Sequence, residues 1–165
     1  IAVEPVLGSR STDTLAGVGP PRVSVGDRLP VGPAGAAPRP LDTPAAARPG
    51  PLRVVAGPRV DWFAVDALEV LCGSPYVVEA DSNRVGLRLA GPAVPRVRDD
   101  ELPSEGMVLG AVQVPPSGRP VVFLADHPPT GGYPVLAVVH PDDLWRCAQL
   151  RPGEEVWFSP TAARA

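Results

Sequence analysis

The sequence contains no lysine, and all 15 of its positively charged side chains are arginines. Chemistry that needs a lysine amine, such as Schiff-base formation or proton transfer by an ammonium group, is therefore excluded. The formal net charge is only −3, and no segment concentrates positive charge. Because binding to polyanions depends on concentrated positive charge, we expect neither a nucleic-acid partner nor an anionic membrane partner.

Cysteine and histidine are also scarce. Cys72 and Cys147 lie far apart and form no Cys-x-x-Cys pair, and His127 and His140 are isolated. We expect two buried, reduced thiols of a cytoplasmic protein, and no metal site. No run approaches the roughly 18 apolar residues of a membrane-spanning helix, so no span is predicted.

Proline and glycine, by contrast, are abundant, with 24 and 17 residues in a chain of 165. Seven of the prolines fall within residues 30–51, among alanines and glycines. Proline removes backbone donors and favours extended chain, which predicts a semi-rigid linker there. Residues 1–29 contain the polar segment LGSRSTD, typical of an Asx or Ser/Thr turn. Residues 52–165 are long enough to form a packed domain.

Within residues 52–165, short apolar runs alternate with turn residues, which predicts about six to eight strands and two helices. The predicted helices cover residues 60–73, with Asp61 as N-cap and Gly73 as C-cap, and residues 140–153, with Pro141 in the first turn. The predicted strands lie in residues 52–57, 75–80, 85–91, 106–114, 119–126, 133–139 and 154–158.

This pattern of elements favours a mainly β fold. Short strands hide their edges best when the sheet closes, so we expect a closed or nearly closed β-barrel with two short helices. A doubly wound parallel sheet is the alternative. It is disfavoured because most connections are too short for parallel crossovers.

Polar side chains gather in three segments of this domain. In EADSNRVGLRL, Arg84 and Arg88 are four residues apart and would share one face of a strand. There they could bind a carboxylate, carbamate or phosphate, or form a solvated pair. In the second segment, Glu105 could act as a general base, accept a hydrogen bond from an amide, or lie in a surface turn. Gln113 interrupts an apolar run, so it either faces solvent or binds something.

The third polar segment is LADHPPTGGYP, residues 124–134. Glycine permits positive φ angles, so Thr130–Tyr133 could turn successive N–H groups toward one point as an anion-binding nest. Asp126 would then lie at the rim. A tight hairpin is the alternative interpretation of the same residues.

Four blocks of the sequence, in this order, resemble one known family: LGSRSTD, SNRVGLRLAG, SEGMVLGAVQVPPSGRPVVFLAD and TGGYPVLAVV. The family is that of the 5-oxoprolinase C-type subunits, also called allophanate hydrolase subunit 2, KipA-like or biotin-dependent carboxyltransferase. The resemblance implies that the chain is the C-terminal half of a longer protein. Residues 1–29 would be the tail of a preceding half-domain, and residues 52–165 a cyclophilin-like barrel.

The resemblance also implies a function. It predicts one component of an ATP-dependent complex that hydrolyses 5-oxoproline to glutamate, with a KipI-like or B-type partner subunit and an A-type subunit. ATP would be used elsewhere in the complex, because this sequence has no phosphate-binding motif. The alternatives are a carboxyltransferase of the urea carboxylase type, the only case that needs biotin, and a KipA-like regulatory module without turnover.

By resemblance, nine residues surround a small-molecule pocket. Glu105 or Asp126 would move a proton as the catalytic group, Gln113 and the Gly131–Gly132 amides would hold an amide or carboxylate, and Arg84 would balance charge. The predicted substrate-binding set is Arg84, Ser104, Gln113, Thr130, Gly131, Gly132 and Tyr133.

The sequence departs from the family at four positions. Many members have Arg-Gln-Thr where this chain has His127, Pro128 and Pro129, and a basic residue where it has Val135. The loss of that basic group, in a chain without lysine, weakens the prediction of carboxybiotin chemistry and favours the 5-oxoprolinase interpretation. His127 could take over a proton-handling role or lie exposed in the turn.

Overall fold

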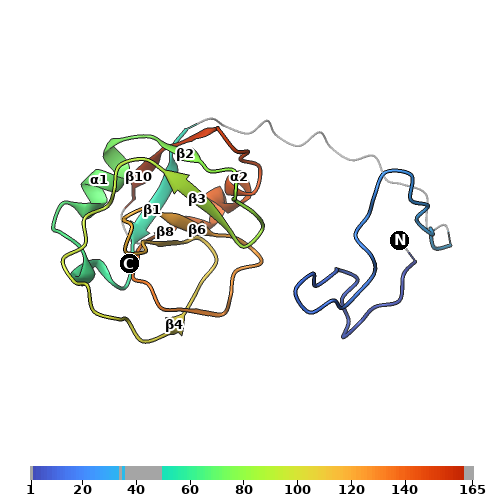
Figure 1. The fold of residues 1–165 in the computed structure, drawn as a ribbon. Helices are drawn as coiled ribbons and strands as arrows, with labels where there is room; N and C mark the ends of the chain where they lie inside the picture. The colour runs from blue at the N-terminus through green and yellow to red at the C-terminus, as the bar shows by residue number, and fades with distance from the viewer. Residues whose placement is uncertain (1, 34, 36–49, 162–165) are drawn as a thin grey trace. The chain divides into compact units, whose positions relative to one another are not determined.

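The computed structural model describes residues 2–33, 35 and 50–161. The chain divides by its internal contacts into two units, Ile1–Ala45 and Ala46–Ala165 (Figure 1). Most of the predicted linker 30–51 lies outside the described residues, so the division at residues 29 and 51 stays a prediction. No described helix is long and apolar enough to cross a bilayer.

The first unit consists of turns joined by isolated bridges, between Val6 and Ser9 and between Asp13 and Val18. The turn predicted in LGSRSTD is confirmed, because the Ser9 hydroxyl accepts a hydrogen bond from the Ser11 N–H at 3.1 Å. Asp13 caps the next turn in the same manner, by accepting from Leu15 N–H. This unit therefore takes its shape from local hydrogen bonds.

The second unit is built on an eight-stranded sheet in the order β10-β1-β8-β5-β6-β3-β2-β9. All neighbouring strands are antiparallel except β1 and β10. The strands of this sheet are β1 (Leu52–Ala56), β2 (Tyr76–Val78), β3 (Gly86–Ala90), β5 (Ala111–Gln113), β6 (Val121–Phe123), β8 (Val135–Val139), β9 (Glu155–Val156) and β10 (Phe158–Pro160). Two further strands, β4 (Glu105–Gly106) and β7 (Thr130–Gly131), form a separate antiparallel pair.

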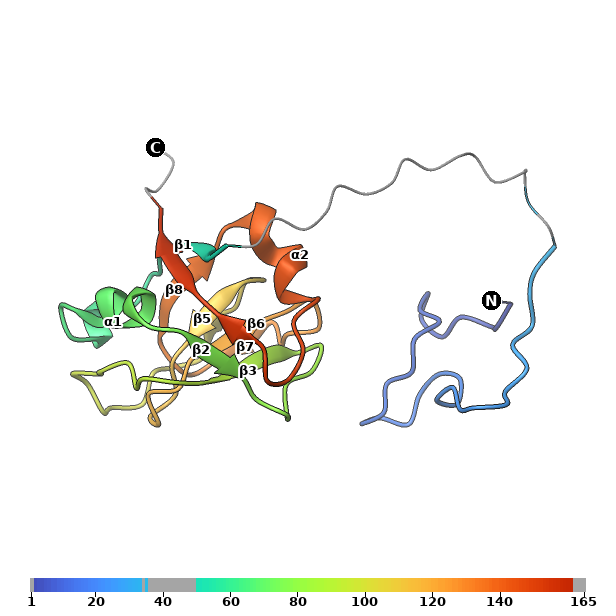
Figure 2. The ribbon, with the colours of Figure 1, turned by 90° about the horizontal axis from the view of Figure 1, so that it is seen from above.

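The two edge strands of the large sheet, β10 and β9, belong to one stretch of chain. Strands β9 and β10 are separated only by Trp157, yet β9 pairs with β2 at one edge and β10 with β1 at the other. Figure 2 shows this last segment, in red, running between β1 and β2. The predicted nearly closed barrel with two short helices is confirmed. The doubly wound parallel sheet is wrong, because β1–β10 is the only parallel pair among the described strands.

The barrel core is filled by apolar side chains from the strands of the large sheet. Val54, Leu89, Val112 and Val122 are at most 1% exposed. Tyr76 and Phe158 meet edge to face with ring centroids 6.0 Å apart, at the point where the sheet closes. Burial also raises the pKa of the Tyr76 hydroxyl to about 12, so the group stays neutral in the core.

The first predicted helix is broken into two pieces. A 3-10 turn, η1, covers Val60–Trp62, and helix α1 covers Ala67–Gly73. Between them Phe63 is extended and forms a bridge to Arg96. The expected N-cap at Asp61 is therefore wrong, since the residue before α1 is Asp66, and the helix ends at Ser74 rather than at a Gly73 cap. The apolar residues that suggested one continuous helix, such as Trp62 and Leu71, are buried in two separate pieces on either side of this break.

The second predicted helix is confirmed in place but is shorter. A 3-10 turn, η2, covers Pro141–Asp143 and leads into α2, Leu144–Cys147. Pro141 occupies the first turn as predicted, where its missing N–H costs nothing.

A single buried carboxylate ties η2 to the barrel. Asp143 is 6% exposed and accepts three hydrogen bonds from Arg53 of β1, from its backbone N–H, Nε and Nη2, at 2.9 to 3.0 Å. The Arg53 guanidinium lowers the pKa of Asp143 below its ordinary 3.8. A carboxyl whose pKa is lowered on folding stabilises the protein fully above the unfolded pKa, and this stabilisation is lost as the pH falls through the folded pKa.

Asp143→Asn tests this contribution. We expect the variant to lose about 1–3 kcal/mol of unfolding free energy at pH 7, because charge-assisted hydrogen bonds to Arg53 are lost. Between about pH 5 and pH 2 the wild type should lose more stability than the variant, since the variant has no charge to lose. Urea unfolding at several pH values measures both effects. Asp99→Asn, at an exposed aspartate, is the control, and equal pH slopes in Asp143→Asn and wild type would contradict the assignment.

Closure of the barrel can be tested at β10. Phe158→Ala removes a side chain that is 2% exposed and packs against Tyr76, so we expect a loss of about 3–5 kcal/mol. Trp157→Ala, at a neighbouring side chain 45% exposed, should cost less than about 1 kcal/mol. Chemical denaturation of both variants gives the comparison, and similar losses would show that β10 does not hold the core together.

Candidate functional site

Seven of the nine predicted site residues gather around the β4–β7 pair. Glu105 lies opposite Gly131, and Gly106 lies opposite Thr130. Ser104 directly precedes β4, while Gly132 and Tyr133 directly follow β7. The seventh of these predicted residues is Gln113, which lies at the end of β5 in the barrel wall. The β4–β7 cluster is defined here as Arg59, Ser104, Glu105, Gln113 and Thr130–Tyr133.

Gln113 is the buried polar group of this cluster. Its side chain is 5% exposed, and its Nε2 donates a hydrogen bond to the Tyr133 carbonyl at 2.9 Å. The pairing of β5 with β8 shifts register between Val112 and Gln113, and such irregularities re-aim side chains. The alternative that Gln113 faces solvent is therefore wrong. Its amide fixes the backbone that follows β7.

The glycines of TGGY serve close packing and not a nest. Neither Gly131 nor Gly132 has the positive φ angle that an anion-binding nest needs, so that prediction is wrong. A Cβ on Gly131 would lie 2.9 Å from Gln113 Nε2 and 3.2 Å from Met107 Cγ. Glycine is required because the β7 backbone lies directly on these two side chains.

Two backbone donors remain available beside these glycines. Within residues 2–33 and 50–161, no group accepts a hydrogen bond from the Gly132 N–H or the Tyr133 N–H. The Ser104 hydroxyl would lie 4.0 Å from a Cβ on Gly132. Two adjacent N–H groups and a hydroxyl are suited to a carbonyl or carboxylate oxygen.

Arg59 is a member of the cluster that the sequence reasoning missed. Its Nε donates to Glu105 Oε2 at 2.9 Å, and its Nη2 donates to Oε1 to complete a bidentate ion pair. The Arg59 N–H also donates to the Val135 carbonyl at 3.2 Å. The only available signal was an arginine directly after the Gly57–Pro58 turn. Because both oxygens of Glu105 are held, proton transfer by Glu105 would require Arg59 to move.

Arg84 and Asp126 lie apart from this cluster. They are joined through the backbone, with Asp126 N–H donating to the Arg84 carbonyl at 3.1 Å. No hydrogen bond or ion pair among the described residues connects either side chain to the β4–β7 cluster. The expected strand face shared by Arg84 and Arg88 is wrong, because β3 begins only at Gly86. Arg88 instead pairs with Asp81 at 3.0 Å.

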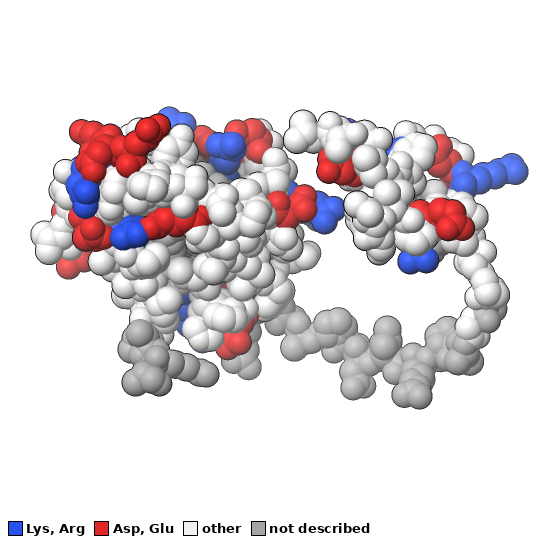
Figure 3. Space-filling view, turned by 90° about the horizontal axis from the view of Figure 1, so that it is seen from below, with Lys and Arg blue, Asp and Glu red and all other residues white. Residues whose placement is uncertain are grey.

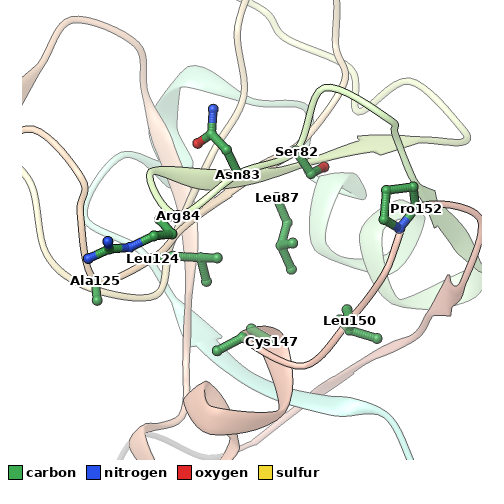
Figure 4. Close-up of a pocket in the computed structure, with 10 residues that line it drawn as sticks. Ser82, Asn83, Arg84, Leu87, Leu124, Ala125, Cys147, Leu150 and Pro152 are labelled. Carbon is green, nitrogen blue, oxygen red and sulfur yellow. The ribbon is translucent and has the colours of Figure 1, made fainter. Parts of the chain in front are cut away.

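Arg84 lies at a cavity of about 350 Å³ between the loop before β3, the end of β6 and helix α2 (Figure 4). The cavity is lined by Ser82, Asn83, Arg84, Leu87, Leu124, Ala125, Cys147, Ala148, Leu150 and Pro152. The predicted site is thus divided between two places, the β4–β7 cluster and this cavity.

The surface and the thiols add little further chemistry. Figure 3 shows acidic and arginine side chains lying beside one another on one face of the larger unit. Both cysteines are free thiols. Cys147 is fully buried as expected, whereas Cys72 is only partly buried, so the expectation of two buried thiols is wrong for Cys72. In the part of the chain that the structure describes, no three His, Cys, Asp or Glu side chains converge as metal ligands.

Comparison with known proteins places this arrangement in a family. The model for the carboxyltransferase domain, subdomains A and B, matches residues 1–160. The chain belongs to this carboxyltransferase-domain family. It is 35% identical to the 5-oxoprolinase C-type subunit of Escherichia coli (strain K12) over 167 residues, which cover 96% of this chain and 52% of that protein. The resemblance found in the sequence is confirmed, and the chain spans about half the length of this relative.

The chain also matches smaller parts of other, longer proteins. Urea amidolyase of Lachancea kluyveri is 32% identical over 111 residues, 61% of this chain and 6% of that protein. The crystal structure of TTHA0988 matches with a TM-score of 0.68 and 42% identity, over 94% of this chain and 30% of that one. The K. lactis urea amidolyase structure matches with a TM-score of 0.63 and 30% identity, over 67% of this chain and 7% of that one.

The four departures from the family pattern flank the β4–β7 cluster. The ring of His127 lies 5.9 Å from that of Phe123, and its Nδ1 is 2.7 Å from the Pro128 carbonyl oxygen. The Pro129 carbonyl accepts a hydrogen bond from Met107 N–H and extends the β4–β7 pairing. Val135 is 5% exposed, in an apolar cluster with Met107, Ala111 and Phe123. Position 135 is thus a packing position in this chain.

Gly131→Ala tests the close packing of the site. The new methyl group must displace the Gln113 amide, so we expect a loss of about 1–2 kcal/mol in unfolding free energy. Gly106→Ala is the matched control on the paired strand, because a Cβ there meets no atom within 4 Å. Urea unfolding followed by tryptophan fluorescence compares the two variants. Equal stability would show that Gly131 is not packed against Gln113.

Proposed function

We propose that this chain is part of one component of an ATP-dependent 5-oxoprolinase complex, in which it contributes the small-molecule site for hydrolysis of 5-oxoproline to glutamate. The observation that carries the proposal is the β4–β7 cluster, where Gln113 fixes the Tyr133 carbonyl and leaves two neighbouring N–H groups free. The similarity to the 5-oxoprolinase C-type subunit supports it. The domain assignment, with residues 1–29 as the tail of a preceding half-domain and 52–165 as the barrel, belongs to the same proposal.

The substrate offers groups that this cluster can bind. A 5-oxoproline molecule has a lactam carbonyl and a carboxylate, both acceptors for the Gly132 and Tyr133 N–H groups and for the Ser104 hydroxyl. These donors are preorganised, because the Gln113 hydrogen bond holds Tyr133 before any ligand arrives. The Arg59–Glu105 ion pair would keep β4 against the barrel, so both residues act as positioning residues.

A proton must reach the lactam nitrogen when the ring opens. Of the two acids predicted for this step, Glu105 is held by Arg59, whereas Asp126 is exposed and makes no ion pair among the described residues. Asp126 also lies on the segment that leads into β7. It is therefore the better candidate for moving the proton, provided that the segment before β7 brings its carboxylate to the bound substrate.

The other components would come from partner subunits. A KipI-like or B-type subunit and an A-type subunit complete the complex, and ATP is used on another component, because the sequence has no phosphate-binding motif. The complex would work in the cytoplasm, in keeping with two reduced cysteines.

Carboxyl transfer of the urea amidolyase type is the second candidate function. The match to the urea amidolyases favours it. It is the weaker candidate because the chain has no lysine and because Val135 is buried in an apolar cluster.

The test reconstitutes the full-length protein that carries this chain with its B-type and A-type subunits. We expect 5-oxoproline-dependent ATP hydrolysis that needs this component, and a loss of about tenfold or more in kcat/KM for Gln113→Ala, because the backbone donors are no longer fixed. Gln149→Ala, at an exposed glutamine, is the matched control and should keep wild-type activity.

Two outcomes contradict the proposal. Unchanged turnover when this component is omitted would remove it from catalysis and favour a regulatory module. Wild-type kinetics in Gln113→Ala, with a normal unfolding midpoint, would remove the β4–β7 cluster from the mechanism. Activity of Asp126→Ala is measured in parallel, and wild-type turnover would exclude that acid.

A further inference from the structure

The cavity next to Arg84 has an apolar interior. Leu87, Leu124 and Cys147 are at most 8% exposed and form its walls. In Figure 4, Leu87, Leu124, Cys147 and Leu150 surround the space from opposite sides. A group that enters this cavity must therefore be largely apolar to gain from burial.

The thiol in the wall does not add covalent chemistry. Burial raises the pKa of Cys147 to about 11, so the thiol is protonated near neutral pH. Its Sγ lies 3.8 Å from the Asp143 carbonyl oxygen, which accepts its weak hydrogen bond. Binding in this cavity is consequently noncovalent.

Ser82 and Asn83, at the mouth of the cavity, are held by hydrogen bonds to nearby backbone N–H groups. The Ser82 hydroxyl accepts a hydrogen bond from the Arg88 N–H at 3.0 Å, and Asn83 Oδ1 accepts one from the Val85 N–H at 2.8 Å. These bonds hold the loop in shape. Figure 4 shows the Asn83 amide pointing away from the cavity and the Arg84 side chain extending beside Ala125.

Arg84 differs from the neighbouring arginines in its side-chain contacts. Among the described residues its guanidinium has no ion-pair or hydrogen-bond partner, although the neighbouring Arg88 pairs with Asp81 and Arg119 pairs with Glu79. Its backbone is fixed, because the Arg84 carbonyl accepts from Asp126 N–H. An unpaired guanidinium at the rim of an apolar cavity selects for a carboxylate on an apolar body.

We propose that this cavity binds a small monocarboxylate, with its apolar body between β3, the end of β6 and α2, and its carboxylate paired with Arg84. The volume of about 350 Å³ corresponds to roughly a dozen water molecules at about 30 Å³ each. Small aliphatic or cyclic acids match this volume. The site is separate from the β4–β7 cluster and does not depend on the proposed function.

The test titrates the full-length protein that carries this chain with cyclohexanecarboxylate and with the neutral cyclohexanecarboxamide, and isothermal titration calorimetry measures both affinities. Neither probe is a lactam, so the result is independent of 5-oxoproline turnover. We expect saturable binding of the acid. Arg84→Gln should weaken binding of the acid about tenfold or more and change binding of the amide less than about twofold.

Two further variants complete the test. Ala148→Phe places a large side chain at an exposed lining position and should abolish binding of both probes without loss of folding. Arg119→Gln, at another surface arginine, should leave both affinities unchanged. The proposal is overturned if the acid does not saturate, if Arg84→Gln binds it as tightly as wild type, or if Ala148→Phe binds either probe normally.

Discussion

Closure of the sheet by one stretch of chain is the constraint on which the rest of the barrel depends. The segment from Glu155 to Pro160 pairs with β2 through its first part and with β1 through its last. This segment therefore joins β1 to β2 and closes the sheet. As a result, side chains from all strands of the large sheet point into one interior. Without this segment both strands would be open edges with unpaired backbone groups.

The candidate site is built against the wall of this barrel. The barrel wall supplies Gln113, and the β4–β7 pair is laid over it by the Arg59–Glu105 ion pair and by the Gln113 hydrogen bond to Tyr133. A rigid strand thus carries the buried polar group, while the two residues that directly follow β7 carry the backbone donors. This division suits a binding site, because the loop backbone can stay open to ligand and still be held in one geometry.

The features that could be predicted from the sequence are those that depend on neighbouring residues in the chain. Apolar runs bounded by turn residues marked most strands of the large sheet, and Pro141 marked the second helix. The single strand predicted at residues 154–158 is instead divided at Trp157 into β9 and β10. The break at Phe63 was not visible, because its cause is a bridge to Arg96, far along the chain. In the site, the partner of Glu105 is Arg59, 46 residues earlier, and nothing in the local pattern links the two. The glycines of TGGY were singled out for a wrong reason. Close packing and not positive φ requires them, against side chains at Gly131 and against the Leu102 carbonyl oxygen at Gly132.

The contact of Gln113 with Gly131 and Met107 has a consequence for sequence variation. A Cβ at position 131 would lie within 3.4 Å of both other side chains, so the three positions fill one shared volume. A larger residue at one of them is compatible with the fold only together with a smaller or reshaped residue at another. Across the carboxyltransferase-domain family, positions 107, 113 and 131 should therefore vary in concert, and the identity of residue 113 should report how closely the β7 backbone lies on the barrel.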